Sequence, residues 1–572
     1  MKHTILQQFF KERLKELFHK DTIDSHRVRF HNTNSLLKEL RTLIVDWKKN
    51  KIKQFETVCL CAQELIDSLK NDEYISMGIY NKELFLKDLE TITKNDGKKF
   101  NGIHELFILD KLINENRLKY LDILFHELEK IVLKGEDFLD EDFIPKAQKI
   151  DNIISLLATE LINSGYSKSY IYSCISAMNE EPDFEKGYQK LKDKFLGDDK
   201  SRFVVIFKLK ITDKEFSDSE IEHIYKDVAP EYLAKNVEAR NKNFLKNGDT
   251  YRFFICEENV RDYYWAIKNT KAKLSSLLDH IYLGINNLNI YIPDKALVID
   301  LNHKNNGAMK STNYISDGKY GSNLALFKQF RIYIAKIDQN MNIKQDVKDR
   351  LNSALRYLRL GNTTIEMEQR FINYWIALEF LFSSPETDEI TFTRLKTNLV
   401  NILYCSYAKR NILLLNTELV TKGIINTTDC FWKFEMEEID RLIDRIDEPL
   451  LRYRIQMMKA KMLGKSDKRK SYLKNHETNL NHHIARIYRL RNELIHEAAI
   501  KQDIENITSN LRYYLVFLLN QMIVYFANIP NERENVDMDD LFNEYLLRKK
   551  QIQHNHEVET ILDIPLEMDL IV

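Results

Sequence analysis

Apolar residues recur every three or four positions along most of the chain, and this spacing predicts helices. Residues 35–47, SLLKELRTLIVDW, and residues 104–133 show the pattern, with charged side chains between the apolar ones. No catalytic motif stands out in this part of the chain. We therefore predict a helical N-terminal region over residues 1–195.

A different pattern follows the polar stretch GDDKSR, which begins at Gly197. Residues 203–211, FVVIFKLKI, are dense in β-branched and aromatic side chains, which favour strands. Three shorter runs of this kind occur at 251–256, 289–293 and 295–301, and a long helical pattern covers 261–285. These elements predict a mixed α/β module over residues 200–340.

The helical pattern returns at Asp346 and continues to Ala527, shortly before Pro530. It predicts a helical bundle over residues 345–530. The last residues, 531–572, contain the acidic DMDD and the polar RKKQIQHNHE, and we expect them to form a C-terminal tail. The expected fold class is mainly α, with a helical N-terminal region, a mixed α/β middle module and a C-terminal helical bundle.

Composition supports this fold class and narrows the chemistry. Only 15 glycines and 8 prolines occur in 572 residues, which is typical of a helical protein and argues against an all-β architecture. With 85 basic and 86 acidic residues, the surface is not cationic overall, so a contact with nucleic acid needs a local basic patch. The six cysteines form no CxxC pair, and we expect reduced thiols and no bound metal or cofactor. No run reaches the roughly 18 uncharged apolar residues that span a bilayer, so we expect a cytoplasmic protein without membrane contact.

The stretch RLRNELIHEAA, residues 489–499, places an arginine inside an apolar stripe. On a helical wheel with about 100° per residue, Arg491 falls near the centre of the stripe that starts at Ile484. Asn492 and His496 lie together at the border of this stripe, one turn apart. The opposite face, which we expect to meet solvent, holds four charged residues: Arg486, Arg489, Glu493 and Glu497.

A guanidinium keeps its charge, so Arg491 needs a partner if it is buried. It can extend from the apolar face into water, it can join two helices in an ion pair, or it can bind a phosphate. Glu379 is the only charged residue of FINYWIALEFLF, residues 371–382, which we expect to be a buried helix. We therefore predict that Glu379 contacts Arg491 and fixes the direction of its side chain.

The residues RNELIH, from Arg491 to His496, resemble the R-x4-6-H signature of HEPN domains. The segment WIALEFLF, residues 375–382, is similar to the first long helix of the ApeA-like HEPN group, in which an ALE element is typical. The resemblance covers roughly residues 345–530. It implies a helical nuclease domain that cuts RNA without a metal, with Arg491, Asn492 and His496 as catalytic residues and Glu379 in support.

The resemblance also implies partners and a biological role. HEPN nucleases pair two domains so that both motifs face one cleft, and this chain has one such motif, so we expect a homodimer with a composite site. ApeA-like proteins resemble abortive-infection effectors of anti-phage defence. The expected role is therefore that of a regulated toxin that cuts RNA, tRNA being one candidate, under the control of a phage trigger or an antitoxin-like partner.

The residue types suit this chemistry. Cleavage can use the 2'-OH of RNA as the nucleophile and leaves a 2',3'-cyclic phosphate and a 5'-OH. A histidine titrates near neutrality, so His496 is the candidate general base or acid. Arg491 would supply positive charge to the phosphoryl oxygens, and Asn492 would orient the imidazole or the substrate.

A basic run, KAKMLGKSDKRKSYLK at residues 459–474, precedes the motif. Such a run can neutralise phosphates and steer RNA towards a cleft, although a solvated connection between helices has the same composition. The expected RNA-binding residues are Lys465, Lys468, Arg469, Lys470 and Lys474.

Two other functions remain open. The first is a HEPN scaffold that dimerises and binds RNA or nucleotide without cleavage. The second is a structural helical protein in which Arg491 and Glu379 form only a buried pair.

Overall fold

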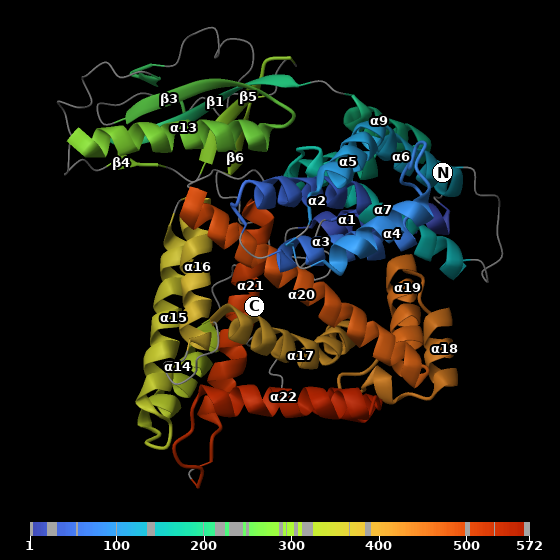
Figure 1. The fold of residues 1–572 in the computed structure, drawn as a ribbon, viewed down its shortest axis with the longest axis vertical. Coiled ribbons are helices and arrows are strands. Elements are labelled where there is room, and N and C mark those ends of the chain that lie inside the picture. The colour runs from blue at the N-terminus through green and yellow to red at the C-terminus, as the bar shows by residue number, and fades with distance from the viewer. Residues whose placement is uncertain are drawn as a thin grey trace.

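The computed structural model describes most of the chain. The described ranges are 4–19, 31–52, 55–95, 97–98, 100–133, 143–197, 200–211, 223–227, 244–246, 251–284, 290–292, 295–302, 307–311, 324–364, 366–383, 391–497, 504–530 and 532–564. For Ser311, His496 and Glu497 the description is limited to the backbone. Helices dominate these ranges and one antiparallel sheet lies in the middle of the chain, which confirms the predicted fold class (Figure 1).

The N-terminal region consists of helices that share one apolar core. Their bounds are α1 (Ile5–Phe18), α2 (Thr33–Lys48), α3 (Glu56–Asn71), α4 (Lys82–Thr93), α5 (Ile103–Asn116), α6 (Lys119–Val132), α7 (Phe143–Asn163), α8 (Lys168–Glu180) and α9 (Phe184–Leu196). Asn32 and Ser35 form a capping box at the start of α2, which satisfies backbone donors at the helix end. Asn32 and Asn34 also donate to the buried carboxylate of Glu160, which joins α2 to α7.

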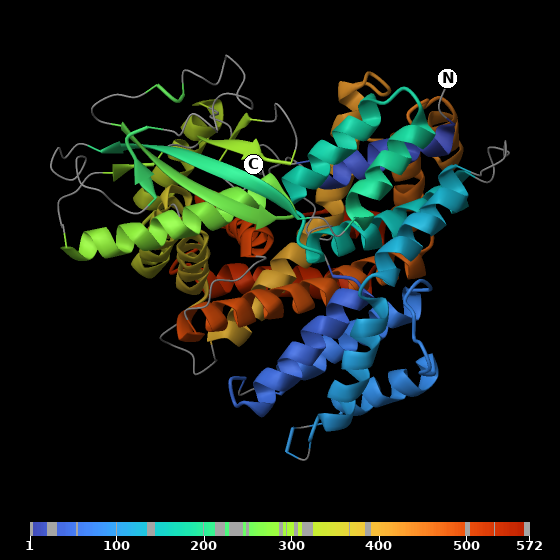
Figure 2. The same cartoon turned by 90° about the horizontal axis from the view of Figure 1, so that it is seen from above.

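The middle module is an antiparallel sheet of strands β1 (Ser201–Ile211), β2 (Ile224–Tyr225), β3 (Tyr251–Val260), β4 (Ile290–Tyr291), β5 (Lys295–Asp300) and β6 (Ala308–Ser311). The strands follow the order β2-β3-β1-β5-β6, and β4 pairs with the end of β1. Alternate residues of β1 point to opposite faces: Val205 and Phe207 pack towards α13 (Tyr263–Gly284), whereas Val204 and Ile206 belong to the core of the other face. Figure 2 shows α13 lying along the strands.

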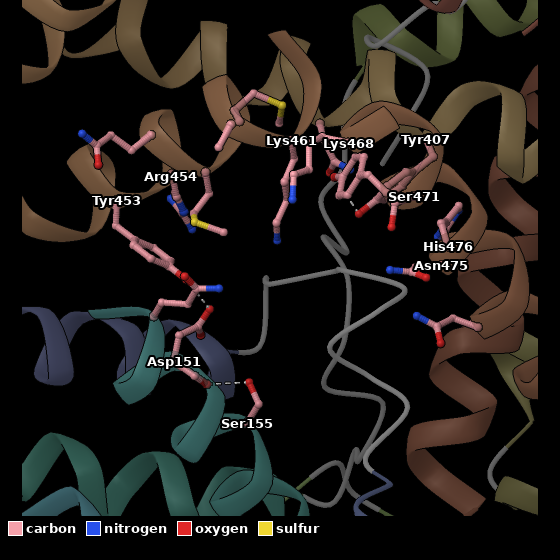
Figure 3. Close-up of a pocket in the computed structure, with 18 of the residues that line it drawn as sticks. Asp151, Ser155, Tyr407, Tyr453, Arg454, Lys461, Lys468, Ser471, Asn475 and His476 are labelled. Carbon is pink, nitrogen blue, oxygen red and sulfur yellow. Dashed lines mark hydrogen bonds between the residues drawn. The ribbon is translucent and has the colours of Figure 1, made fainter. Parts of the chain in front are cut away.

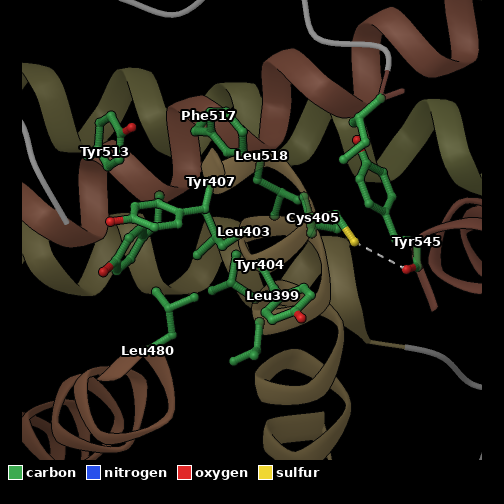
Figure 4. Packing of buried hydrophobic residues seen from close by; sticks show 14 of the residues in the cluster. Leu399, Leu403, Tyr404, Cys405, Tyr407, Leu480, Tyr513, Phe517, Leu518 and Tyr545 are labelled. Atoms are coloured by element: carbon green, nitrogen blue, oxygen red, sulfur yellow. Dashed lines mark hydrogen bonds between the residues drawn. The ribbon is translucent and has the colours of Figure 1, made fainter. Parts of the chain in front are cut away.

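The C-terminal region is a second helical body with its own core. Its elements are α14 (Leu324–Gln339), α15 (Gln345–Thr363), α16 (Met367–Phe382), α17 (Thr391–Thr421), the 3-10 helix η3 (Phe431–Lys433), α18 (Met436–Asp444), α19 (Pro449–Met458), the π-helix η4 (Lys459–Leu463), α20 (Ser466–Glu497), α21 (Ile504–Ala527), α22 (Met538–His554) and α23 (Val558–Leu562). Figure 4 shows part of the core around α17, where Leu403 and Tyr407 gather with Phe517 and Leu518 of α21.

Helices α15 and α16 form an antiparallel hairpin at one side of this body (Figure 1). At Gly361 of α15 an added Cβ would overlap the ring of Tyr374 in α16, so glycine allows the two helices their close approach. The phenol of Tyr374 donates to Asn362 Oδ1 at 2.9 Å, which adds a polar link between the two helices. This hairpin fixes the position of Glu379 on α16.

The expectation of a C-terminal tail over residues 531–572 is wrong for its described part. Helix α22 lies along the base of the C-terminal region and buries Leu541, Phe542 and Tyr545 in the common core (Figure 1). The acidic DMDD begins this helix: the carboxylate of Asp537 accepts from the backbone N–H groups of Asp539 and Asp540, as an N-cap residue does. Residues 565–572 lie outside the described ranges.

A search of the described helices for a membrane span finds none with the required length and apolarity.

Candidate functional site

The motif residues lie in the last turns of α20, the long helix between the N-terminal region and the C-terminal core. The stripe that was predicted from Ile484 faces this core, since Ile484, Ile487 and Leu490 are all buried. Its end does not follow the prediction: Ile495 is 47 % exposed, because the stripe leaves the core in the last turn. Arg491 therefore stands at the edge of the core.

The predicted contact between Glu379 and Arg491 is present. Arg491 Nη2 donates to Glu379 Oε1 at 3.2 Å, and the two side chains are 25 % and 32 % exposed. Helix α16 is thus not buried on every side, since Glu379 lies on its accessible side next to α20. The ion pair is open enough to water for a ligand to approach it, and its contribution to stability is correspondingly small.

The core fixes the orientation of Glu379. The indole of Trp375, which is almost fully buried, donates its Nε1–H to Glu379 Oε1 at 2.5 Å. The Trp375 ring lies 5.8 Å from that of Tyr488 on α20, and Tyr488 stacks on Phe392 of α17 at 3.7 Å. Packing sets the position of Trp375, and its indole fixes the carboxylate oxygen that also accepts from Arg491. The guanidinium of Arg491 is therefore held in a defined direction.

The guanidinium of Arg491 has further capacity for hydrogen bonds. Its Nη1 donates to the side-chain oxygen of Asn492 at 3.1 Å, and its Nε is buried without a partner in the described part of the chain. An arginine offers five N–H donors, and the two contacts above use one each at Nη1 and Nη2. Because Nε is buried, the second N–H groups of Nη1 and Nη2 are the donors that suit an oxyanion such as a phosphoryl group, which arginine binds through paired N–H groups.

His496 follows Asn492 by one turn of α20, as the sequence requires. Its side chain lies outside the described part of the structure, as do residues 498–503. The predicted proximity of the imidazole to Arg491 and Asn492 stays a prediction from helical spacing.

The prediction of a solvated face opposite the stripe is wrong for Arg486 and Arg489. Arg486 is 6 % exposed and binds Glu39 of α2 through Nε (3.0 Å) and Nη2 (2.9 Å), and Glu64 of α3 through Nη2 (2.7 Å). Arg489 also pairs with Glu39. The helical wheel treats α20 as having one buried face, whereas the N-terminal helices cover its second face.

This interface, formed by Arg486, Arg489, Glu39 and Glu64 and called here the charge cluster, includes a histidine at its edge. Burial alone would raise the pKa of Glu39, but Arg486 and Arg489 beside it hold that pKa well below its usual range. For His31, burial and then the charge of Arg486 lower the pKa to about 4. The cluster therefore favours ionised carboxylates and a neutral imidazole in the folded protein.

The basic run lies far from the motif. Residues 459–474 form η4, a short turn and the first turns of α20. Lys468 precedes Arg491 by 23 residues on one continuous helix, which separates them by roughly 35 Å. Within one chain, the run could therefore meet RNA only far from the motif, and its binding of RNA stays a prediction.

The five residues of the run that were expected to bind RNA differ in their surroundings. Lys465, Lys468, Lys470 and Lys474 are exposed. Arg469 instead donates to the backbone carbonyls of Met462, Gly464 and His556, so its guanidinium joins η4 to the chain after α22. Arg469 therefore has a structural role, which the composition of the basic run does not show.

A search of the described residues for three or more His, Cys, Asp or Glu side chains that could hold a metal ion finds no such group.

Sequence reasoning missed a pocket of about 1890 Å³ at the opposite end of α20. Its signal was present in the basic run, four of whose lysines line it: Lys459, Lys461, Lys468 and Lys474. Arg491 and Asn492 are not among its lining residues.

Comparison of the chain with protein-family models, with curated proteins and with solved structures finds no match.

Proposed function

We propose that this chain is a metal-independent endoribonuclease of the HEPN type, with Arg491, Asn492 and His496 as its catalytic residues. The observation that carries the proposal is the state of Arg491: Glu379 and Trp375 fix its direction, Asn492 binds one end, and donors remain for a phosphate. A cation that is oriented before the substrate arrives stabilises developing negative charge without reorganisation.

The proposed reaction is an internal transfer. His496, or its counterpart in a second copy, removes the proton from a 2'-OH, and O2' forms a bond to the adjacent phosphorus. The bond from phosphorus to O5' breaks, the leaving oxygen takes a proton, and the products end in a 2',3'-cyclic phosphate and a 5'-OH. Arg491 neutralises the phosphoryl oxygens, and Asn492 orients the imidazole or the substrate.

Separate base and acid roles are easiest with two imidazoles, and one chain has one motif. We therefore propose a homodimer in which two α20 helices bring their motifs to one cleft. Uncontrolled cleavage of RNA would be toxic, so the proposed setting is a cytoplasmic effector of anti-phage defence. A phage trigger or an antitoxin-like protein would control it, and tRNA is one candidate substrate.

The test is cleavage of total cellular RNA in EDTA by the wild-type protein, by His496→Ala and by His554→Ala. His554 is an exposed histidine at the end of α22, so its variant controls for the loss of any imidazole. We expect fragments with 2',3'-cyclic phosphate ends from the wild type and from His554→Ala, and none from His496→Ala. Equal cleavage by His496→Ala would refute the assignment of the catalytic residue.

One observation favours a second function, a scaffold without catalysis. Within the described residues, Arg491 binds two protein groups, Asn492 and Glu379, and a purely structural arginine would make the same contacts. In that case the wild type would bind RNA or nucleotide without cutting it. Arg491→Ala would then lower the midpoint of thermal unfolding without changing any cleavage rate.

A further inference from the structure

The large pocket lies between the N-terminal and C-terminal regions. Figure 3 shows its two walls: Asp151 and Ser155 come from α7, whereas Lys461 comes from η4 and Lys468 and Asn475 come from α20. The volume of about 1890 Å³ exceeds the range of about 300–1,000 Å³ that is typical of pockets for small ligands. A ligand that fills it is larger than a single metabolite, or one molecule occupies only part of it.

The acidic residues of the pocket are mostly neutralised by basic neighbours. Arg13 pairs with Glu16 at 3.0 Å and with Asp151 at 2.6 Å, and Lys459 pairs with Asp440 at 2.5 Å. Glu418 binds Arg454 at 3.0 Å.

The remaining acidic residues sit on α3. Glu64 belongs to the charge cluster through Arg486, at 2.7 Å. Asp67 accepts a hydrogen bond from Gln63. Because the amide of Gln63 is uncharged, Asp67 keeps its negative charge, and the basic character of the pocket is confined to the opposite wall.

Three lysines on the opposite wall have no such compensation. Lys461, Lys468 and Lys474 line the pocket, and within the described ranges none of them has an ion pair or a hydrogen bond from its ammonium group. All three lysines are exposed to water. The C-terminal wall therefore presents positive charge that is available to an anion.

The same wall contains stacked rings. Tyr407 of α17 stacks on His476 of α20 at 3.8 Å and 15°, and its hydroxyl binds that of Tyr472 at 2.8 Å. The ammonium of Lys461 lies 5.9 Å from the centre of the Tyr472 ring. Tyr472 is only partly buried, so part of its ring is open to the pocket. A flat base can stack on such a ring while its phosphates meet the lysines.

We propose that this pocket binds a nucleotide, with its phosphates on Lys461, Lys468 and Lys474 and its base on Tyr472. The chemistry fits a free nucleoside polyphosphate and a nucleotide unit of an RNA strand. The site is distinct from the motif at the other end of α20, so the proposal goes beyond the nuclease function and does not require it. Because the pocket has walls from both regions, its ligand would join the N-terminal helices to the helix that carries the motif.

The experiment is calorimetric titration of the full-length His496→Ala protein, which removes the proposed cleavage of an RNA probe. The probes are inorganic pyrophosphate, ATP and a 5'-phosphorylated tetraadenylate. The test variants are Lys461→Glu with Lys468→Glu, and separately Lys474→Glu, Tyr472→Phe and Tyr472→Leu. Lys470→Glu is the matched control, since Lys470 is exposed on the same helix turn and does not line the pocket. Circular dichroism checks that each variant is folded.

We expect ATP or the tetraadenylate to bind, and the double lysine variant to weaken binding by at least about tenfold. Lys474→Glu should also weaken it, and Lys470→Glu should leave it within about twofold. Tyr472→Phe should retain binding that Tyr472→Leu loses, because the first keeps the ring. Tighter binding of ATP identifies a free nucleotide as the ligand, and tighter binding of the tetraadenylate identifies an RNA strand.

Three outcomes would overturn the proposal. The first is no binding of any probe at about 1 mM. The second is an equal loss in Lys470→Glu and in the lysine variants, which would mean a general surface effect. The third is pyrophosphate binding as tight as that of ATP and insensitive to Tyr472→Leu, which would mean an anion site without recognition of a base. None of these outcomes depends on whether the protein cuts RNA.

Discussion

Replacing Arg486 tests how the N-terminal region is held against the motif helix. Arg486→Met keeps a long apolar side chain but removes the guanidinium that lies between Glu39 and Glu64. Both carboxylates are largely buried, with side-chain exposures of 12 % and 14 %. The variant therefore leaves two buried negative charges near one another.

The magnitude follows from the partners that remain. Removal of one member of a buried pair typically costs about 3–5 kcal/mol. Glu39 keeps Arg489, and among the described residues Glu64 keeps His482, whose Nδ1 lies 3.7 Å away. Because half of the compensation survives, we expect the lower end, about 3 kcal/mol. This corresponds to a rise of roughly a hundredfold in the local opening of the interface.

Hydrogen exchange measured by mass spectrometry resolves this loss by segment. We expect the amides of α2, α3 and the second half of α20 to lose protection by about that factor, while α22 is unchanged. Arg356→Met, at an exposed arginine of α15, is the control for the substitution itself. The triple variant with Glu39→Gln and Glu64→Gln should recover part of the protection, since both buried carboxylates are then neutral and Arg489 keeps Glu493 at 3.9 Å. Unchanged protection in the single variant, or no recovery in the triple variant, would refute the reasoning.

Three further predictions follow from the same structure. The pKa of His31 is about 4 in the folded protein and about 6.5 when unfolded, so the neutral imidazole contributes its full stability above pH 6.5 and loses it as the pH falls. Hydrogen exchange at pH 5 should therefore show about 2 kcal/mol less stability around α2, and His31→Gln should reduce this loss. Glu379→Gln keeps an oxygen for Trp375 and Arg491, so RNA cleavage should stay within about threefold, whereas Glu379→Ala should lower it at least about tenfold; equal rates would show that Glu379 does not position Arg491. Phe542→Ala should cost about 3–5 kcal/mol in thermal unfolding, because the ring is 4 % exposed and stacks on Phe382, whereas Leu547→Ala at an exposed site should cost under about 0.5 kcal/mol.

The sequence was sufficient to predict the contact between Glu379 and Arg491, because each is a lone charge on an apolar helix face and needs a partner. The same reasoning failed for Arg486 and Arg489. Periodicity describes one helix at a time, and it assigns a charged face to water unless another element is known to cover it. The acids that cover this face are more than 400 residues earlier in the chain, and Glu39 precedes Arg486 by 447 residues.

The prediction of a C-terminal tail was wrong for a related reason. Its charged composition suggested a tail, although Leu541, Phe542 and Tyr545 already have helical spacing and Asp537 precedes them as a cap. The prediction relied on the polar stretch RKKQIQHNHE and not on this apolar spacing. For the basic run, the composition predicts positive charge but not the direction in which the lysines point, because only the placement of η4 and α20 opposite the N-terminal helices puts Lys461 and Lys468 in a pocket.

Helix α20 connects the three features on which the proposals rest. Its first turns line the pocket, Arg486 and Arg489 bind the N-terminal helices, and Arg491 reaches Glu379. Arg486 and Arg489 are at most five positions from Arg491 on this helix, so a movement of the N-terminal helices acts on α20 within about two turns of the motif. A nucleotide in the pocket would hold the N-terminal helices against the end of α20 that is far from the motif. Low pH or Arg486→Met would instead loosen these helices near the motif. If cleavage is regulated through this region, Arg486→Met should therefore change the cleavage rate without any change in the residues that contact RNA, and the double lysine variant should change only its dependence on nucleotide.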